Sequence, residues 1–414
     1  MYDVESFIPA DGPDLYFPRD EYDRRLARTR ELMVEQGLDV LVVSNTSNIG
    51  YLTGYDTTMS PGYCRLIIPV SGDLSVHSTM VEVPSLLLTS TVPPDRSYRF
   101  EWTEAQSTGE ALAELLNELG YSGKRIGLEM GSAETFATGA FDTKSYLALV
   151  AGVAGATFVD ATLLVLEVRV IKTAAEIEYM KKAGALTAHG LTAGIEAVRE
   201  GVSENAVAAA VYDALLCAGS QVPSIAPMVV TGPRTGWMPH VAFNNHTIEA
   251  GDPVYFEVTG TYRRYNAPAM RSAVVGEPSD EVRRLADSNI ETIELLLQAI
   301  KPGRTGHDIA MEVGGPVKAM AESSGSWFQG GYGYSIGMGF DPTWTEAPVY
   351  IAEGADRVLE PGMAFHLPMC NFIPGRAGTG FSHSVVVTES GCESLTPHDS
   401  FELTARPRAD VLAG

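Results

Sequence analysis

The pattern of apolar residues changes near residues 165–172, and this change limits the chain to two differently built parts. Upstream, short apolar runs alternate with segments of helical periodicity, whereas downstream long amphipathic helices precede strands interrupted by glycine and proline. At the change, a strand-like run is followed by an amphipathic helix that opens with Thr173 and Glu176, the spacing of a capping box. A chain of 414 residues is long enough for two domains. We therefore predict one domain at residues 1–168 and a second at residues 169–414.

The first part predicts an α/β domain with a mixed sheet, because helices and strands alternate along it. Helices are expected at 24–36, ending at Gly37, and at 109–120, with strands at 38–44, 64–70 and 124–130. The second part predicts an α+β domain in which antiparallel strands carry helices on one side. Its helices are expected at 173–200, 203–219, 280–300 and 307–322, and its first strand pair at 254–260 and 269–276.

The balance of charges argues against two classes of partner. The chain has 52 acidic and 29 basic residues, a formal net charge of −23, which opposes attraction to nucleic acid or to an anionic membrane surface. No apolar run reaches the ~18 residues of a membrane span, and the start MYDVESFIPADGPD lacks the pattern of a signal peptide. A cytoplasmic location is therefore expected. The four cysteines form no CxxC pair, which argues against a disulfide scaffold or a thiolate zinc site.

Glu257 stands at the centre of an apolar strand, VYFEV. Because side chains alternate along a strand, Tyr255 and Glu257 share one face, and Val254, Phe256 and Val258 share the other. The pattern alone leaves two readings open with equal weight: the carboxylate lies on a solvated face, or it lies in a pocket.

Other residues capable of chemistry gather in the second part. Four histidines lie in or beside its strand-like segments: His240, His246, His366 and His383. A histidine in such a position is more often a surface or core residue than a catalytic one, and the pair Arg263–Arg264 is more often solvated. The glycine-rich run at 328–340 lacks the GxGxxG spacing of a nucleotide site, and HExxH does not occur.

Several motifs resemble those of the creatinase/aminopeptidase P/methionine aminopeptidase family. They are VRVIKTAAEIEYMKKA, Pro239–His240, Gly251–Asp252, the strand pair around Glu257, KPGRTGHDIA, GYSIG, LEPGMAFHLPM and VVVTESGCE. In the first part, SNTSNIGYLTGYD resembles the family's smaller domain. The resemblance implies an α+β catalytic domain with the pita-bread fold, preceded by a smaller α/β creatinase-type N-terminal domain.

Metal-dependent members of that family hold two divalent ions with two Asp, one His and two Glu. In this chain the resemblance places the ligand positions at Glu257, Pro268, Tyr334, Pro368 and Ser382, with His383 as an alternative to Ser382. A proline has no side-chain donor, and a pair of divalent ions needs several carboxylates. We therefore expect no metal, and no other cofactor.

Metal-free members include creatinase, whose catalytic histidine precedes the Gly-Asp turn, and the resemblance gives this role to His240. A closer likeness is to the ectoine hydrolases, through EVTG, RRYNAP, GYSIG, DPTWTE and PGMAFH. Asn266 and the Ser382–His383 pair depart from their pattern. The resemblance implies a metal-independent hydrolase that opens a C–N bond of a small zwitterionic cyclic amidine. The expected substrate is ectoine, and the product an N-acetyl-2,4-diaminobutyrate.

This chemistry assigns roles to individual residues. His240 is the expected acid/base, Glu257 holds the substrate cation or attacks as a nucleophile, and Tyr334 orients the leaving group. Arg271 is expected to bind the substrate carboxylate, because a guanidinium pairs with a carboxylate through two hydrogen bonds. Further substrate contacts are expected from Arg263, Arg264, Tyr265, Asn266, Asp341, Trp344, Glu346, His366 and His383.

Alternatives remain open. One is a creatinase-like hydrolase of a guanidino acid, or a related lyase or ring-opening enzyme. Another is a non-catalytic peptide-binding pseudo-peptidase, which would have no need for His240. An Xaa-Pro dipeptidase would require bound metal. The family resemblance also implies a homodimer in which Tyr51, Tyr55 or Arg65 reaches the site of the partner.

Overall fold

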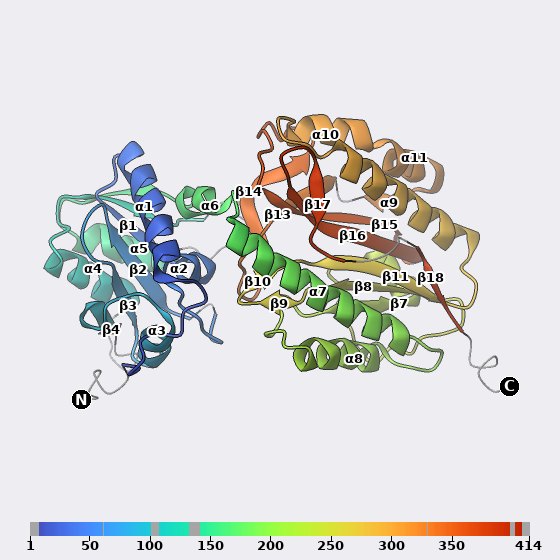
Figure 1. Cartoon of the computed structure of the whole chain (residues 1–414), viewed down its shortest axis with the longest axis horizontal. Coiled ribbons are helices and arrows are strands. Elements are labelled where there is room, and N and C mark those ends of the chain that lie inside the picture. Colours follow the sequence, from blue (N-terminus) through green and yellow to red (C-terminus); the bar gives the residue numbers. More distant parts are fainter. Residues whose placement is uncertain are drawn as a thin grey trace. The chain divides into compact units, whose positions relative to one another are not determined.

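The computed structural model describes residues 8–60, 62–100, 107–131, 141–328, 330–397 and 402–407. The chain divides into two compact units, Met1–Arg169 and Val170–Gly414 (Figure 1). Each unit has its own hydrophobic core. Among the described residues, none of the helices has the length and apolar character needed to cross a membrane.

The first unit is built on a six-stranded mixed sheet, as predicted. The strand order is β4-β3-β2-β1-β5-β6, with β1 antiparallel to β2 and parallel to β5. The strands are β1 (Val40–Val43), β2 (Cys64–Pro69), β3 (Ser75–Thr79), β4 (Ser97–Phe100), β5 (Arg125–Leu128) and β6 (Thr157–Asp160). The helices are α1 (Arg19–Glu35), α2 (Thr46–Thr53), α3 (Val83–Thr89), α4 (Thr108–Glu118), α5 (Thr143–Gly152) and α6 (Leu164–Arg169).

Helix α6 corrects one expectation, because the apolar run before Lys172 is helical where a strand was predicted. Leu164, Val165 and Leu166 are all buried in this short helix. The sequence LVLEVR sets Glu167 and Arg169 two residues apart between apolar residues, and over so few residues this alternation resembles a strand.

The second unit contains two larger sheets and a hairpin. One sheet has the order β18-β11-β8-β7, and the other β14-β13-β15-β16-β17 with β12 paired to β15. Its strands are β7 (Met228–Thr231), β8 (Pro253–Val258), β9 (Thr261–Tyr262), β10 (Tyr265–Asn266), β11 (Ala269–Val275), β12 (Trp327–Phe328), β13 (Gly331–Ile336), β14 (Thr345–Ala352), β15 (Ala364–Ile373), β16 (Ala377–Val387), β17 (Cys392–Ser394) and β18 (Thr404–Arg406). Its helices are α7 (Ala174–Ala197), α8 (Glu204–Cys217), α9 (Asp280–Ala299), α10 (Gly306–Val313) and α11 (Gly315–Ser324).

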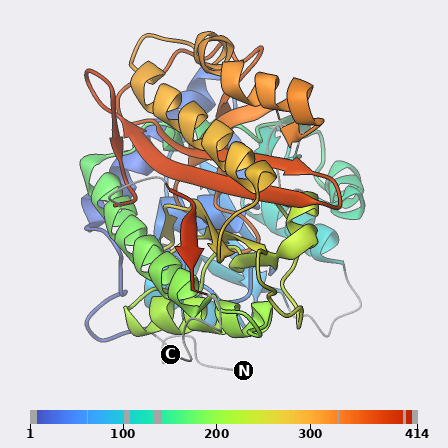
Figure 2. The ribbon, with the colours of Figure 1, turned by 90° about the vertical axis from the view of Figure 1, so that its right-hand side faces the viewer.

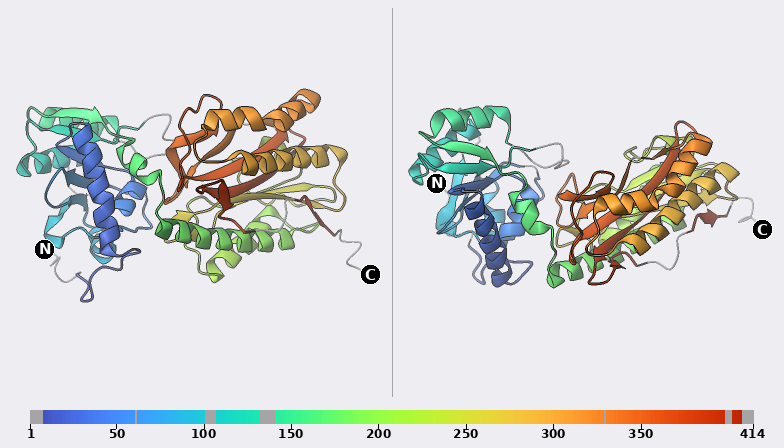
Figure 3. Two further views of the ribbon diagram at one scale, coloured as in Figure 1. Left: turned by 45° about the horizontal axis from the view of Figure 1, so that its top comes forward. Right: turned by 90° about the horizontal axis from the view of Figure 1, so that it is seen from above.

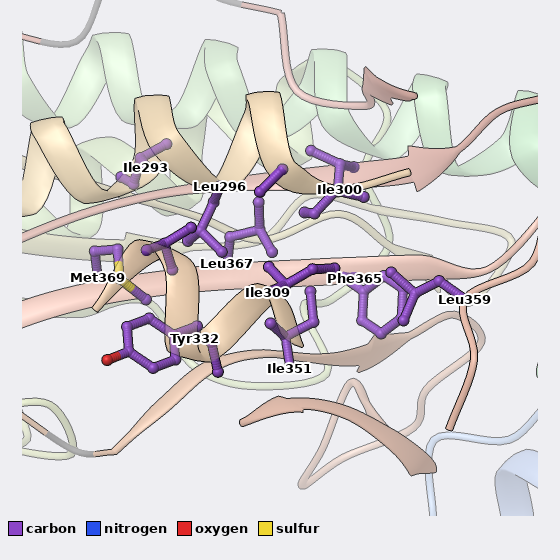
Figure 4. Packing of buried hydrophobic residues seen from close by; sticks show 14 of the residues in the cluster. Ile293, Leu296, Ile300, Ile309, Tyr332, Ile351, Leu359, Phe365, Leu367 and Met369 are labelled. Carbon is purple, nitrogen blue, oxygen red and sulfur yellow. The ribbon is translucent and has the colours of Figure 1, made fainter. Parts of the chain in front are cut away.

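Helices cover the outer face of each of these two sheets. Figures 2 and 3 show α9 lying along the larger sheet, while α7 and α8 lie on the side of the smaller one. In Figure 4, Phe365, Leu367 and Met369 of β15 pack against side chains of α9 and α10. On the smaller sheet, Phe256 and Val258 of β8 pack in the core that includes α7 and α8 residues.

Strand alternation then fixes the inner faces. Because Phe365 and Leu367 face the helices, His366 between them faces inward. Phe256 and Val258 also face helices, so Glu257 between them on β8 faces inward as well. The inner faces meet where β11 contacts β16, since the Met270 amide donates a 2.6 Å hydrogen bond to the Ser382 hydroxyl. The polar side chains of the candidate site lie between these two sheets.

Candidate active site between two sheets

Glu257 is a buried carboxyl, and one of its two oxygens accepts a hydrogen bond. The side chain of Tyr255, on the same face of β8, donates a 2.9 Å hydrogen bond to Glu257 Oε2, as the alternation of VYFEV predicts. Glu257 is 3% exposed, which settles the choice between a solvated face and an enclosed position. Within the described part of the chain, no hydrogen bond reaches Oε1, and the His366 Nδ1 atom is 4.0 Å away from it.

Four further side chains form a continuous hydrogen-bonded chain beside this carboxyl. The Tyr334 hydroxyl lies 2.8 Å from His366 Nδ1, and His366 Nε2 lies 2.6 Å from the Ser382 hydroxyl. The indole of Trp344 donates a 2.9 Å hydrogen bond to the Tyr334 oxygen. The β13–β15 pairing sets Tyr334 opposite His366, and the β15–β16 pairing brings Ser382 within reach. Residues 334, 366 and 382 thus meet although they are far apart in sequence.

Burial shifts the pKa values of both partners of this 4.0 Å contact between Glu257 and His366. Removal from water raises the pKa of Glu257 to about 7, opposed by the hydrogen bond from Tyr255. It lowers the pKa of His366 to about 3, because the charged imidazolium loses hydration. His366 is therefore a neutral imidazole at neutral pH, and its contact with Glu257 is not an ion pair. Glu257 exchanges its proton in the range where general acids and bases work best.

The raised pKa of Glu257 has a measurable effect on stability. Between pH 4.5 and about 7, the unfolded-state carboxyl is ionised while the buried one keeps its proton. The folded state then binds more protons, so this group lowers the free energy of unfolding as pH rises through that window. In Glu257→Gln this contribution is absent. We expect the free energy of unfolding of the variant, relative to that of the wild type, to rise by about 3 kcal/mol from pH 4 to pH 8. Urea denaturation at each pH measures this difference. A difference that stays constant across this range would contradict the raised pKa.

His240 lies outside this buried cluster. It is exposed, and its side chain makes no hydrogen bond within the part of the chain that the structure describes. Its loop nevertheless borders the cluster, because Met238 is buried with Tyr255 and Met270, and Val241 packs against the same group. The loop follows a 3-10 turn at Gly232–Trp237. The structure thus places His240 beside the site and not in contact with Glu257.

Arg271 lies on the opposite face of the sheet from Glu257. It is paired in register with Phe256, which packs on the helices, whereas Met270 is paired with Glu257. Its guanidinium donates to the backbone oxygens of Met270 and Ser382 at 2.6 and 2.8 Å. Burial lowers its pKa to about 10. Arg271 lines a surface hollow of about 550 Å³ beside Leu191 of α7, so the expectation that it meets the substrate next to Glu257 is not met by this geometry.

The arginine pair forms the turn of the β9–β10 hairpin. Arg263 and Arg264 have φ angles of 50° and 65°, the left-handed region that both turn residues of a type I′ hairpin adopt. The Arg263 guanidinium lies 5.9 Å from the ring centre of Tyr262, and Arg264 lies 4.5 Å from that of Phe340. Phe340 follows β13, the strand that carries Tyr334. Arg264 therefore contacts the segment that follows Tyr334, through the ring of Phe340.

Tyr265 and Asn266 support the fold around the site. The Tyr265 hydroxyl donates a 2.8 Å hydrogen bond to Glu176 on α7. Asn266 is fully buried, and its carbonyl oxygen accepts from Ser224 and Thr261, both at 2.9 Å. Its amide nitrogen donates to Arg264 O at 3.0 Å and lies 3.5 Å from two further backbone oxygens. The Asn266 amide is therefore saturated by the protein, and the geometry does not present it to a substrate.

The remaining expected contact residues are placed in different ways. Trp344 belongs to the cluster, whereas Asp341 is exposed. Glu346 is buried in an ion pair, with its Oε2 2.7 Å from the Lys172 ammonium. His383 faces away from the cluster, on the same side of β16 as the core residues Phe381 and Val385. Its Nδ1 atom is 2.9 Å from the Thr396 hydroxyl.

Tyr55 and its companions lie in the first unit. The Tyr55 hydroxyl donates to Glu82, Tyr51 lies beneath the Arg25 guanidinium, and Arg65 lies between the rings of Tyr63 and Phe141. These are contacts within one chain, and a role of these residues at a partner's site stays a prediction.

The donor set does not fit a pair of divalent ions. Within the described ranges, no three His, Cys, Asp or Glu side chains gather in a way that could hold a metal. The expected ligand positions bring together one carboxyl, Glu257, with the phenol of Tyr334 and the hydroxyl of Ser382. Neutral hydroxyl groups do not offset the charge of two divalent cations.

Two members of the cluster were missing from the sequence-based site. Tyr255 was placed on the right face but given no role, although a phenol two residues from a strand carboxyl is a ready hydrogen-bond donor. Ser382 was considered only as a lost ligand position. Its partner His366 lies on a neighbouring strand, and that pairing is not visible in a single sequence.

The family assignment agrees with this architecture. Residues 178–389 match metallopeptidase family M24, and residues 25–171 match the creatinase/prolidase N-terminal domain. An ectoine hydrolase from Halomonas elongata is 30% identical over 399 residues, covering 92% of this chain and 96% of that protein. An uncharacterized hydrolase/peptidase from Sinorhizobium fredii is 31% identical over 392 residues, covering 92% and 97%.

Solved structures confirm the predicted fold class. A prolidase from Thermococcus sibiricus, 22% identical, has a TM-score of 0.80 over 93% of this chain and 99% of that one. The chain thus has a creatinase-type α/β domain followed by a pita-bread domain. It belongs to metallopeptidase family M24 and carries a creatinase/prolidase N-terminal domain before the M24 domain.

Proposed function

We propose that this protein is a metal-independent hydrolase that opens a C–N bond of a small zwitterionic cyclic amidine, with ectoine as the substrate. The observation that carries the proposal is Glu257, a buried carboxyl with a pKa near 7 at a position where metal-dependent relatives need a ligand. Its Oε1 atom accepts no hydrogen bond from the described residues. The similarity to an ectoine hydrolase over nearly the whole chain supports the choice of substrate.

The chemistry needs no Lewis acid, because a protonated amidine carbon is already electrophilic. Water adds its oxygen to this carbon, and the carbon becomes tetrahedral. The ring nitrogen then takes up a proton and the C–N bond breaks, so that the product is an amide heavier than the substrate by one water. Glu257 attracts the amidinium cation through its ionised carboxylate, and burial strengthens this attraction.

Two further roles complete the proposal: attack on the amidine carbon and binding of the substrate carboxylate. His240 is the candidate acid/base that activates water, and its loop is anchored beside Tyr255 by Met238 and Val241. Alternatively, Glu257 Oε1 attacks the amidine carbon itself, which its lack of a hydrogen bond would permit. For the substrate carboxylate we propose Arg264, since it lies over Phe340 in the segment that follows Tyr334.

The proposal is tested by mass spectrometry of purified, EDTA-treated protein incubated with ectoine, hydroxyectoine and creatine. We expect ectoine to gain one water, at a rate unchanged by EDTA. Conversion of creatine alone would establish the creatinase-like alternative. If none of the three is converted and a dipeptide ending in proline is cleaved only after metal is added back, the proposal is wrong.

A further inference from the structure

Both ends of the polar chain receive hydrogen bonds from groups that can only donate. At one end the Trp344 indole N–H points to the Tyr334 oxygen, 2.9 Å away. At the other end the Met270 backbone N–H points to the Ser382 hydroxyl, 2.6 Å away. Between these ends lie a phenol, a neutral imidazole and a serine hydroxyl. A neutral imidazole donates from one nitrogen and accepts at the other, so the two links cannot both have the imidazole as donor.

The two tautomers of His366 distribute the hydrogens differently. With the hydrogen on Nε2, the imidazole donates to Ser382, and Tyr334 donates to Nδ1. Ser382 then accepts twice, and its own hydrogen needs a further acceptor. Among the described residues, the Ser382 hydroxyl has no hydrogen-bond partner beyond Met270 and His366. Since Ser382 is fully buried, this hydrogen would lose its interaction with water and gain nothing.

With the hydrogen on Nδ1, the Ser382 hydrogen and the imidazole hydrogen both find acceptors, and the hydrogen left over is the one on the Tyr334 hydroxyl. Ser382 donates to Nε2, and Nδ1–H donates to the Tyr334 oxygen, which also accepts from Trp344. The hydrogen of the Tyr334 hydroxyl is then not used by His366. The groups that act on this phenol besides His366 and Trp344 include the Thr345 side chain and the Glu257 carboxyl. The phenol keeps its proton, because burial raises the pKa of Tyr334 well above its usual range.

We propose that Ser382 is a positioning residue that holds His366 in the Nδ1–H tautomer and thereby leaves the Tyr334 hydroxyl free to donate to the substrate. Tyr334 donates a hydrogen bond to the ring nitrogen on which charge develops as the C–N bond breaks. The hydrogen-bonded chain of Ser382, His366 and Tyr334 thus provides a fixed donor at a position where metal-dependent relatives need a ligand. The identity of the reacting nitrogen rests on the proposed function, whereas the tautomer does not.

The tautomer is measured directly, without substrate, by long-range ¹H–¹⁵N correlation spectra of protein labelled with ¹⁵N-histidine. The His366 signal is assigned as the one lost in His366→Gln. We expect a neutral ring with its hydrogen on Nδ1 in the wild type, and a mixture of both tautomers in Ser382→Ala, because no hydroxyl then donates to Nε2. Ser384→Ala is the matched control, because Ser384 lies on the same strand but donates to Pro268 O, at 2.7 Å. A wild-type ring with its hydrogen on Nε2 overturns the proposal, whatever the substrate is.

Kinetics then separate positioning from a merely structural role. On the substrate that the enzyme turns over, we expect Ser382→Ala to lower kcat about 10- to 100-fold, the usual loss when the partner that orients a functional imidazole is removed. KM should stay unchanged, and Ser382→Thr should restore most of kcat because it keeps the hydroxyl. Equal losses in Ser382→Ala and Ser382→Thr would contradict the assignment. A protein that turns over none of the tested amidines refutes the proposed function, while the spectra still decide the tautomer.

Discussion

Glu257→Gln lowers the turnover of the amidine substrate by about 10²- to 10³-fold, the range expected when one charged group that stabilises the transition state is lost. The amide keeps the size of the side chain and can still accept the hydrogen bond from Tyr255, but it cannot carry a negative charge. Steady-state kinetics on ectoine measure this effect. In the wild type, kcat/KM should fall as the pH drops through about 7, because the Glu257 carboxylate becomes protonated there.

The control for this variant is Glu249→Gln, an exposed glutamate ahead of the same strand, which should keep wild-type activity. Two results would count against the role of Glu257. One is a Glu257→Gln enzyme with wild-type kcat/KM. The other is a wild-type profile that stays flat between pH 5 and pH 8.

The largest effect on stability is expected from Lys172→Met, with a loss of about 3 to 5 kcal/mol in the free energy of unfolding of the second unit. Lys172 and Glu346 are 1% and 3% exposed and lie 2.7 Å apart, so removal of the ammonium leaves a buried carboxylate without its counter-charge. Denaturant unfolding monitored by near-UV circular dichroism measures the loss.

The double variant Lys172→Met/Glu346→Leu should recover most of that loss, since an apolar pair of similar volume needs no counter-charge. As a control, Lys181→Met breaks the exposed pair with Glu393 and should cost about 1 kcal/mol or less. If the single and double variants are equally unstable, the cost comes from lost packing and not from the unpaired charge.

The sequence predicted the architecture because the local patterns and the global fold agree. The alternation of VYFEV placed Tyr255 and Glu257 on one face of β8, and the hydrogen bond between them confirms it. The capping box at Thr173 and Glu176 likewise marks the start of α7. In α6, Glu167 and Arg169 alternate with apolar residues as they would in a strand, and the predicted element type was wrong.

The site was predicted less well, because it depends on which strand face meets which neighbour. The β11 segment AMRSAVV has no alternation of polar and apolar residues, so nothing in the sequence shows that Arg271 turns toward the helices. Asn266 was expected to contact substrate, but partners distant in sequence, such as Ser224 and Gly337, surround its amide. The connection from Tyr334 through His366 to Ser382 spans three strands and exists only in the folded protein.

The central claim is that buried hydroxyl, imidazole and carboxyl groups of this chain do the work that metal ions do in other M24 hydrolases. The most direct test measures metal content and ectoine turnover on the same protein sample. We predict full turnover with substoichiometric manganese, cobalt, zinc and iron, and no increase when these ions are added. Turnover that rises in proportion to bound metal would contradict the account.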